Sequence, residues 1–158
     1  IPSVIAPTAS PAEVEENVQL TKKTFTKSGY QYRITSTSKR TVKVTKMTTK
    51  RTSILIPSTV KSNGVRYKVT AIGDNAFKGQ NKATRISIGS NITTVGKKAF
   101  YGCSKAKKIV ILSGKIKKVG SAAFSKMKNK ALIKVPASKK TGYQKLFKKS
   151  KSSKFSWK

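Results

Sequence analysis

Apolar and polar residues alternate along much of the first half of this 158-residue chain. From Gly29 onward, apolar side chains recur at every second position, with Lys, Arg, Thr and Ser between them. An alternation of period two that is rich in β-branched residues predicts strands with one buried face. The residues expected on that face are Tyr30, Tyr32, Ile34, Val42, Val44, Ile54 and Ile56.

A β-hairpin is predicted shortly after these strands. The dipeptide Asn63-Gly64 separates two stretches of strand-like apolar positions, and it is the strongest short-range signal for a two-residue hairpin turn. The flanking positions are Val60 before the turn and Val65, Tyr67 and Val69 after it.

A six-residue motif occurs three times in the second half of the chain, as IGDNAF, VGKKAF and VGSAAF. Its phenylalanines are Phe77, Phe100 and Phe124, which are 23 and then 24 residues apart. A period of this length is typical of short stacked repeats. We expect the glycine of each motif to permit a tight turn, and a short helical turn to carry the Ala and Phe inward.

A pair of apolar residues, with one residue between them, begins nine residues after each phenylalanine. The pairs advance along the chain with the same spacing as the motif, so that turn and strand repeat together. A unit this small cannot bury its own apolar face, whereas stacked units share a core and form a parallel sheet. The predicted repeat core is Ile72, Phe77, Ile86, Ile88, Val95, Phe100, Cys103, Ile109, Ile111, Val119, Phe124, Ile133 and Val135.

From about Thr52 to Pro136, the sequence resembles the BspA-type bacterial leucine-rich repeats. The resemblance is carried by the pattern IG..AF.GC......I.I and by the preceding segment ILIPSTVKSNGVRYKVTAIG. The resemblance implies an α/β-type repeat solenoid that is rich in β-structure. Its short leucine-rich repeats of 23–24 residues would have an N-terminal β-hairpin cap and a short helical C-terminal cap. The chain departs from the family at Ala83 and Ala106, where leucine is usual, and at Lys126, which replaces a repeated glycine.

The chain divides into a linker and one domain. Residues 1–22 are rich in proline and small residues, which favours a tether, with a short helix from Pro11 to Leu20 as the alternative. Residues 23–158 form a single domain, in which Tyr143, Leu146 and Phe147 cover the open end of the solenoid. Its parts are a β cap at 23–71, three repeats at 72–135 and a C-terminal cap at 136–158.

The composition is strongly basic. Lys and Arg supply 36 residues but Asp and Glu only 4, so the formal net charge is +32. Three acids, Glu13, Glu15 and Glu16, lie in the linker, and Asp74 is the fourth. Such a charge attracts anionic partners at long range and loses that attraction as salt rises. The charge alone does not choose among nucleic acid, acidic polysaccharide, teichoic acid and anionic lipid.

Nucleic acid is the less favoured of these partners. Tyrosines lie among the basic residues, and base stacking is a real binding mode. However, the basic residues are mostly lysines, whereas arginine is the residue suited to bidentate recognition of phosphate or guanine. The chain also carries no RNA-recognition, helix-turn-helix or zinc-finger signature.

Enzymatic activity is not expected, and neither is a cofactor, a metal site or a catalytic residue. The chain has no histidine, which removes the commonest general base and the usual catalytic triads. Asp74 follows a glycine at the start of a turn, which favours a capping role over an acid catalyst. Cys103 is the one cysteine, and without a histidine partner it is expected to be a packing thiol.

The family resemblance implies a non-enzymatic, exported bacterial protein that mediates macromolecular binding or adhesion at the cell surface. Its partner would be a protein or an anionic polymer on a host or bacterial surface. The alternative is a polyanion binder of low specificity for wall teichoic acid, glycosaminoglycan or nucleic acid. The candidate binding surface consists of the residues that lie next to the inward-facing apolar pairs of the predicted strands: Arg85, Ser87, Lys108, Val110 and Lys134. The alternative is that these are ordinary solvent-exposed positions without a binding role.

No transmembrane segment is predicted, because the longest apolar run, from Ile109 to Leu112, has four residues and a spanning helix needs about 20. The chain begins at Ile1 and not at a methionine. We therefore expect a secreted or cell-surface protein whose signal peptide is removed before Ile1. We also expect a monomer.

Overall fold

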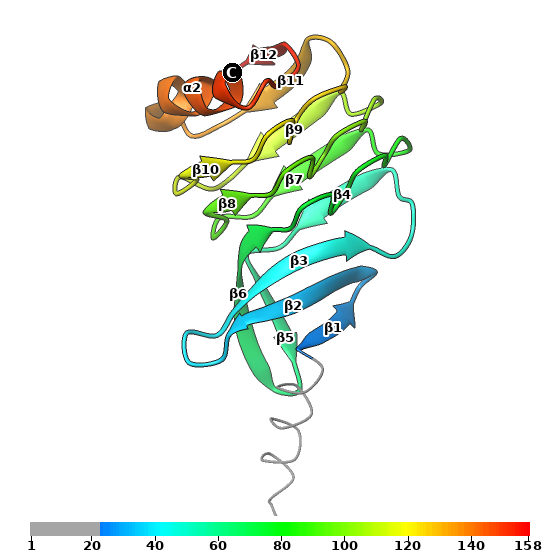
Figure 1. The fold of residues 1–158 in the computed structure, drawn as a ribbon, viewed down its shortest axis with the longest axis vertical. Helices are drawn as coiled ribbons and strands as arrows, with labels where there is room; N and C mark the ends of the chain where they lie inside the picture. Colours follow the sequence, from blue (N-terminus) through cyan, green and yellow to red (C-terminus); the bar gives the residue numbers. More distant parts are fainter. Residues whose placement is uncertain (1–22) are drawn as a thin grey trace, which may run out of the picture.

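Two sheets run along the long axis of the molecule in the computed structural model, which describes residues 23–158 (Figure 1). The predicted linker and its helical alternative lie outside the described residues. The seven-stranded sheet contains β1 (Thr24–Lys27), β2 (Tyr30–Ser36), β3 (Thr41–Met47), β6 (Val65–Ile72), β8 (Thr94–Val95) and β10 (Lys118–Val119), with β5 (Thr59–Ser62) paired to β6. The five-stranded sheet contains β4 (Ser53–Ile56), β7 (Arg85–Ile88), β9 (Lys108–Ile111), β11 (Ala131–Lys134) and β12 (Phe155–Trp157).

The N-terminal part is antiparallel. Strands β1, β2 and β3 pair in succession, and β5 and β6 form the hairpin that the sequence predicts. Its turn residues, Asn63 and Gly64, have φ angles of 48° and 77°, as a type I′ turn requires. The apolar face predicted from the alternation is buried, with Tyr32 and Val44 among its members.

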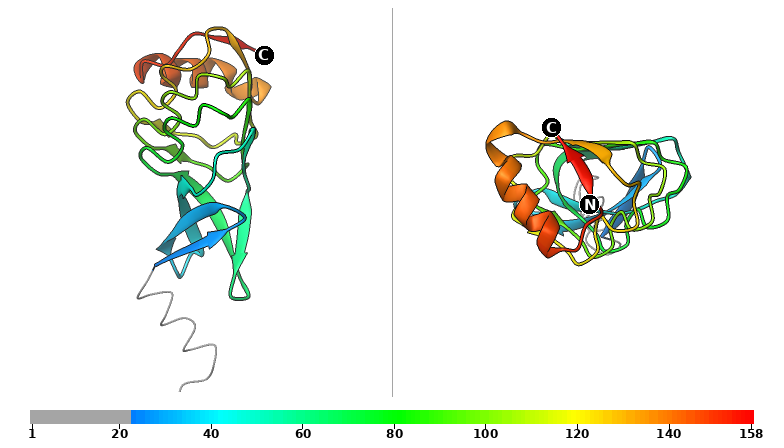
Figure 2. Two further views of the ribbon diagram at one scale, coloured as in Figure 1. Left: turned by 90° about the vertical axis from the view of Figure 1, so that its right-hand side faces the viewer. Right: turned by 90° about the horizontal axis from the view of Figure 1, so that it is seen from above.

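The five-stranded sheet is parallel throughout. Its register stacks Ile54, Ile86, Ile109 and Ile133 in one inward row. All four side chains are fully buried. The prediction of a β-rich solenoid with parallel strands is thereby confirmed, and Figure 2 shows its successive coils from above.

The parallel ladder extends beyond residues 72–135 at both ends. It begins at β4, inside the segment expected to form the β cap, and ends at β12, inside the segment expected to form the C-terminal cap. Strand β4 joins because its sequence SILI has the same alternation of inward isoleucines as RISI in β7. Hydrogen bonding therefore runs across both of the boundaries drawn from the sequence.

Aromatic rings form a continuous stack inside the coil. The ring centroids of Phe77 and Phe100 lie 5.2 Å apart, and those of Phe100 and Phe124 also lie 5.2 Å apart. Phe147 adds a fourth ring, 4.4 Å from Phe124. These separations are typical of stacked aromatic pairs, so each coil places its ring on that of the next.

The C-terminal end is covered by a helix. A 3₁₀ turn, η2 (Ala137–Lys139), leads into α2 (Lys140–Lys149), which lies across the end of the solenoid (Figure 1). Tyr143 and Phe147 are the buried residues of α2. The hydroxyl of Tyr143 donates to the carbonyl of Ser113 at 2.7 Å and accepts the N–H of Ile116 at 3.1 Å. The helix is thus anchored by both apolar packing and buried hydrogen bonds.

The expected helical turn in each repeat is not formed. Instead, alternate backbone N–H groups bond to the next coil: that of Phe77 donates to Ala99 at 2.7 Å, and that of Gly79 to Tyr101 at 2.8 Å. A helical turn would keep these donors within its own segment. The coils are therefore joined by backbone hydrogen bonds on the turn side as well as in the sheets.

The motif glycines have a different role from the one expected. Gly96 and Gly120 are not among the glycines with positive φ. A Cβ at Gly96 would lie 2.5 Å from the backbone nitrogen of Asp74, and one at Gly120 would lie 2.5 Å from that of Lys97. Glycine is required because the neighbouring coil approaches too closely for any side chain, and not because the turn needs an unusual dihedral.

Candidate functional site

The five candidate surface residues lie on one face of the parallel sheet. Arg85 pairs in register with Lys108, and Val110 pairs with both Ser87 and Lys134. Arg85 and Lys134 are exposed, and the other three are partly buried between their neighbours. Because alternate residues of a strand point to opposite faces, all five project to solvent while the isoleucines between them project into the core.

Two exposed leucines belong to the same face and were missed by the sequence analysis. Leu55 in β4 is 53% exposed, and Leu112, which follows β9, is 57% exposed. They are the large hydrophobic side chains exposed among residues 23–158. Leu55 pairs with Ser87, and the N–H of Leu112 continues the ladder to Ile88 at 2.9 Å.

We call the solvent side of β4, β7, β9 and β11, including Leu112, the outer sheet face. This face combines apolar and cationic side chains. For example, Leu132 in β11 pairs with Lys108 in β9. The sequence did carry a signal for Leu55, namely an apolar residue at an outward position between two inward isoleucines. The repeat spacing does not reach β4, so the sequence pattern groups this strand with the cap and not with the sheet of the repeats.

The seven-stranded sheet carries a second surface feature, a groove of about 450 Å³ that crosses the coils. Its floor includes Gly73, Gly96 and Gly120, and Lys97 and Lys118 also line it. At Gly96 and Gly120, the backbone of the neighbouring coil lies too close for a side chain.

Asp74 also lines this groove, and its carboxylate caps a turn as expected. Its Oδ1 accepts the N–H of Lys97 at 2.8 Å, so the carboxylate caps the corresponding turn of the next repeat and not its own. Asp74 is the only acid in residues 23–158. A pair of carboxylates for general acid–base chemistry is therefore absent from this part of the chain.

Burial keeps two titratable side chains, Cys103 and Tyr32, in their neutral forms. Cys103 is fully buried, and its thiol donates to the carbonyl of Phe77 at 3.2 Å. Burial raises the pKa of Cys103 to about 12, so the nucleophilic thiolate is scarce at neutral pH. Burial also raises the pKa of Tyr32 to about 12, with Tyr30 adding to the effect.

Residues 23–158 bring together no group of three or more His, Cys, Asp or Glu residues that could hold a metal ion. Within the same residues, no helix is both long enough and apolar enough to cross a membrane.

Comparison with known proteins places this fold among bacterial repeat proteins. A family model described as BspA type Leucine rich repeat region, with six copies, matches residues 46–157. A leucine-rich repeat protein from Bacteroides capillosus is 26% identical with a TM-score of 0.61, and the match covers 73% of this chain and 84% of that protein. Among curated proteins, no sequence matches the chain.

Two further solved structures are much longer than this chain. A leucine-rich repeat protein from Bacteroides ovatus is 27% identical with a TM-score of 0.58, over 71% of this chain and 35% of that protein. A leucine rich cell surface protein from Faecalibacterium prausnitzii is 24% identical with a TM-score of 0.58, over 72% of this chain and 37% of that protein, and this likeness is one of fold. The chain thus spans little more than a third of these two relatives.

Proposed function

The chain belongs to the BspA-type leucine-rich repeat family, and on that basis we propose that it is a non-enzymatic, exported bacterial protein that binds a macromolecule at the cell surface. The outer sheet face is the proposed contact surface, and a protein is the proposed partner. The cell-surface location is supported by the fold shared with the F. prausnitzii cell surface protein.

The observation that carries this proposal is the composition of the outer sheet face. Leu55 and Leu112 are more than half exposed, and both lie on this one sheet. Exposed apolar side chains that gather beside polar ones are typical of protein interaction sites. Arg85 and Lys108 form an adjacent cationic pair, so a complementary partner would present an apolar patch bordered by acidic residues.

The positive charge supports a second candidate, the polyanion binder of low specificity. Residues 23–158 contain a single acid, so almost none of their cationic charge is compensated within the chain. Diffuse attraction of this kind depends on total charge and weakens steeply with salt. It does not depend on any single apolar residue, and this difference separates the two candidates.

Adhesion of protein-coated beads to an epithelial cell monolayer in 150 mM NaCl tests the proposal. We expect protease treatment of the monolayer to abolish adhesion, and Leu55→Ser/Leu112→Ser to reduce it by about thirtyfold, since each leucine buried in an interface contributes about 1 kcal/mol or more. The matched control is Lys82→Ala/Lys105→Ala, which changes two exposed loop residues and should leave adhesion nearly unchanged.

The competing candidate makes opposite predictions in the same assay. Adhesion would survive protease, fall after digestion of acidic polysaccharide, weaken steeply as NaCl is raised, and be unaffected by the leucine variant. That pattern would replace protein binding with polyanion binding as the function.

A further inference from the structure

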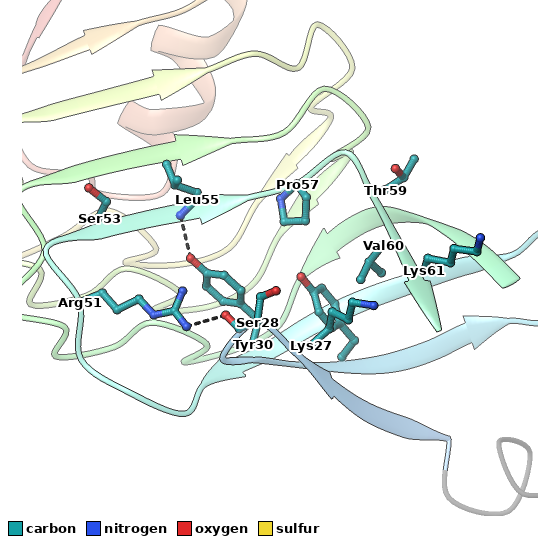
Figure 3. Close-up of a pocket in the computed structure, with 11 residues that line it drawn as sticks. Lys27, Ser28, Tyr30, Arg51, Ser53, Leu55, Pro57, Thr59, Val60 and Lys61 are labelled. Carbon is teal, nitrogen blue, oxygen red and sulfur yellow. Dashed lines mark hydrogen bonds between the residues drawn. The ribbon is translucent and has the colours of Figure 1, made fainter. Parts of the chain in front are cut away.

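A cavity of about 390 Å³ opens between the first strand of the parallel sheet, β4, and the hairpins that precede and follow it (Figure 3). Its walls come from the β1–β2 turn, the loop before β4, and β5. The volume lies in the range of small-ligand sites, about 300–1,000 Å³. The cavity borders the outer sheet face at Leu55 but is formed mainly by other residues.

The edge of β4 that faces the cavity is closed to an added strand. The backbone N–H of Leu55 donates to the hydroxyl of Tyr30 at 2.8 Å (Figure 3). Pro57, two residues further on, has no N–H to offer. A peptide could not extend the sheet here without displacing the tyrosine, so recognition must come from the side chains that line the cavity.

The side chain of Arg51 is pre-organised at this cavity by two hydrogen bonds and a cation–π contact. Its Nη2 donates to the carbonyl of Ser28 at 2.6 Å, and its Nε donates to Thr49 Oγ1 at 3.2 Å. The guanidinium carbon lies 5.3 Å from the centre of the Tyr30 ring, within cation–π range. Gly29 makes room for it, because a Cβ there would collide with Nη2.

Among the residues that the structure describes, the charge of Arg51 has no acidic partner. The single acid in residues 23–158, Asp74, lines the glycine groove and caps the turn at Lys97. A guanidinium that is fixed in advance loses little entropy when it binds a carboxylate or a sulfate. Two further cations, Lys27 at the end of β1 and Lys61 in β5, reach the same cavity from separate elements and are exposed.

The rest of the lining is suited to a sugar. Hydroxyl groups of Ser28, Ser53 and Thr59 can exchange hydrogen bonds with sugar hydroxyls, and Leu55 and Pro57 offer an apolar surface to the C–H groups of a ring. We propose that this cavity binds an acidic saccharide, whose carboxylates or sulfates pair with Arg51 on one side of the cavity and with Lys27 and Lys61 on the other (Figure 3).

Nucleic acid does not fit the same lining. Sequence-tolerant binding of single strands requires aromatic faces on which bases stack. The aromatic residues at the cavity are Tyr30 and Tyr32, which are only 4% and 1% exposed. Their rings belong to the core, and the Tyr30 hydroxyl is already bonded to β4.

Titration calorimetry in 150 mM NaCl tests this proposal with two probes, a heparin-derived tetrasaccharide and tetragalacturonate. We expect at least one of them to bind with a stoichiometry of one. We further expect Lys27→Ala/Lys61→Ala to weaken that binding by about tenfold, because two charge-assisted contacts are lost. Binding of tetragalacturonate would mean that carboxylates suffice, and binding of the heparin fragment alone would mean that sulfate is required.

The control Lys82→Ala/Lys105→Ala removes the same charge from exposed positions outside the cavity lining, and it should change the affinity by less than about twofold. Thermal melts check that both double variants are folded. Equal weakening by the two variants, several ligands bound per protein, or no binding of either saccharide would overturn the proposal. Equally tight binding of hexaglutamate or of an oligothymidylate, with the same dependence on Lys27 and Lys61, would also overturn it.

Leu55 belongs to both proposed sites, so the residues that only one site uses separate the two proposals. The saccharide titration depends on Lys27 and Lys61, which lie outside the outer sheet face, whereas Leu112 belongs to the proposed protein interface and not to the cavity lining. Either proposal can therefore fail while the other stands.

Discussion

Lys126 occupies a backbone conformation that the first two repeats assign to glycine. Its φ is 54°, and the corresponding residues Gly79 and Gly102 have φ angles of 74° and 79°. A residue with a Cβ is disfavoured in this left-handed region by roughly 1–2 kcal/mol. The third repeat therefore carries local strain that the first two avoid.

Exchanging the residues at these positions should change stability in opposite directions. We expect Lys126→Gly to raise the free energy of unfolding by up to about 1 kcal/mol, because relief of the strain exceeds the added freedom of the unfolded chain. Gly102→Ala should lower it by about 1–2 kcal/mol. Urea unfolding measures both. A loss of stability in Lys126→Gly would show that the lysine side chain, and not its backbone, dominates at this site.

The phenylalanine stack is the element that joins one coil to the next. Phe100 has a ring 5.2 Å away on each side and is fully buried, whereas Phe155 contacts the stack edge-on and is partly exposed. A unit of 23 or 24 residues has no core of its own, so much of its stability comes from contacts with its neighbours. The ring of Phe100 makes two such contacts, one with Phe77 and one with Phe124.

Truncation in the middle of the stack should therefore cost more than truncation at its end. We expect Phe100→Ala to lower the free energy of unfolding by about 3–5 kcal/mol, through lost transfer energy and a residual cavity. Phe155→Ala should cost clearly less, because its ring is already partly in water. Urea unfolding followed by circular dichroism provides the comparison. Equal losses for the two variants would mean that the rings do not act as one continuous core.

At the scale of the whole molecule, like charges surround the coil. The formal net charge is +32, and Asp74 alone is acidic in residues 23–158. Repulsion among the lysines opposes the compact state, and salt shortens the screening length from about 10 Å at 0.1 M to about 3 Å at 1 M. Stability should thus depend on ionic strength more than in a protein of balanced charge.

Raising NaCl from 50 to 500 mM should raise the melting temperature by several degrees, since 1 kcal/mol corresponds to about 4 °C for a domain of this size. Scanning calorimetry measures the shift. KCl at the same ionic strength should have the same effect if screening is the cause. A melting temperature that does not change with salt would mean that the lysines lie too far apart to repel one another appreciably.

The fold could be predicted largely from the sequence because its signals are local. The alternation around Tyr32 and Val44 determines which face is buried, and Asn63-Gly64 specifies a turn within two residues. The spacing of Phe77, Phe100 and Phe124 establishes the repeat before any contact is known. Each of these patterns is set by the period of a strand, by a turn dihedral or by the length of one coil.

The candidate sites could be predicted only in part. The sequence identified Arg85, Lys108 and the other outward residues of the repeats, but not the leucines beside them, because β4 had not been assigned to the same sheet. It also could not indicate that the carboxylate of Asp74 reaches the next coil, since that partner is 23 residues away. The cavity at Arg51 had no signal in the sequence at all.

The sequence by itself thus determined the repeat, the buried face and the excess of positive charge, because periodicity and composition are properties of the chain. Only the tertiary structure decided which surface groups act together. Lys27, Arg51 and Lys61 come from three separate elements, and they line one cavity because the hairpins fold back onto the first coil. Such contacts depend on register and packing between distant segments, which no local pattern of residues encodes.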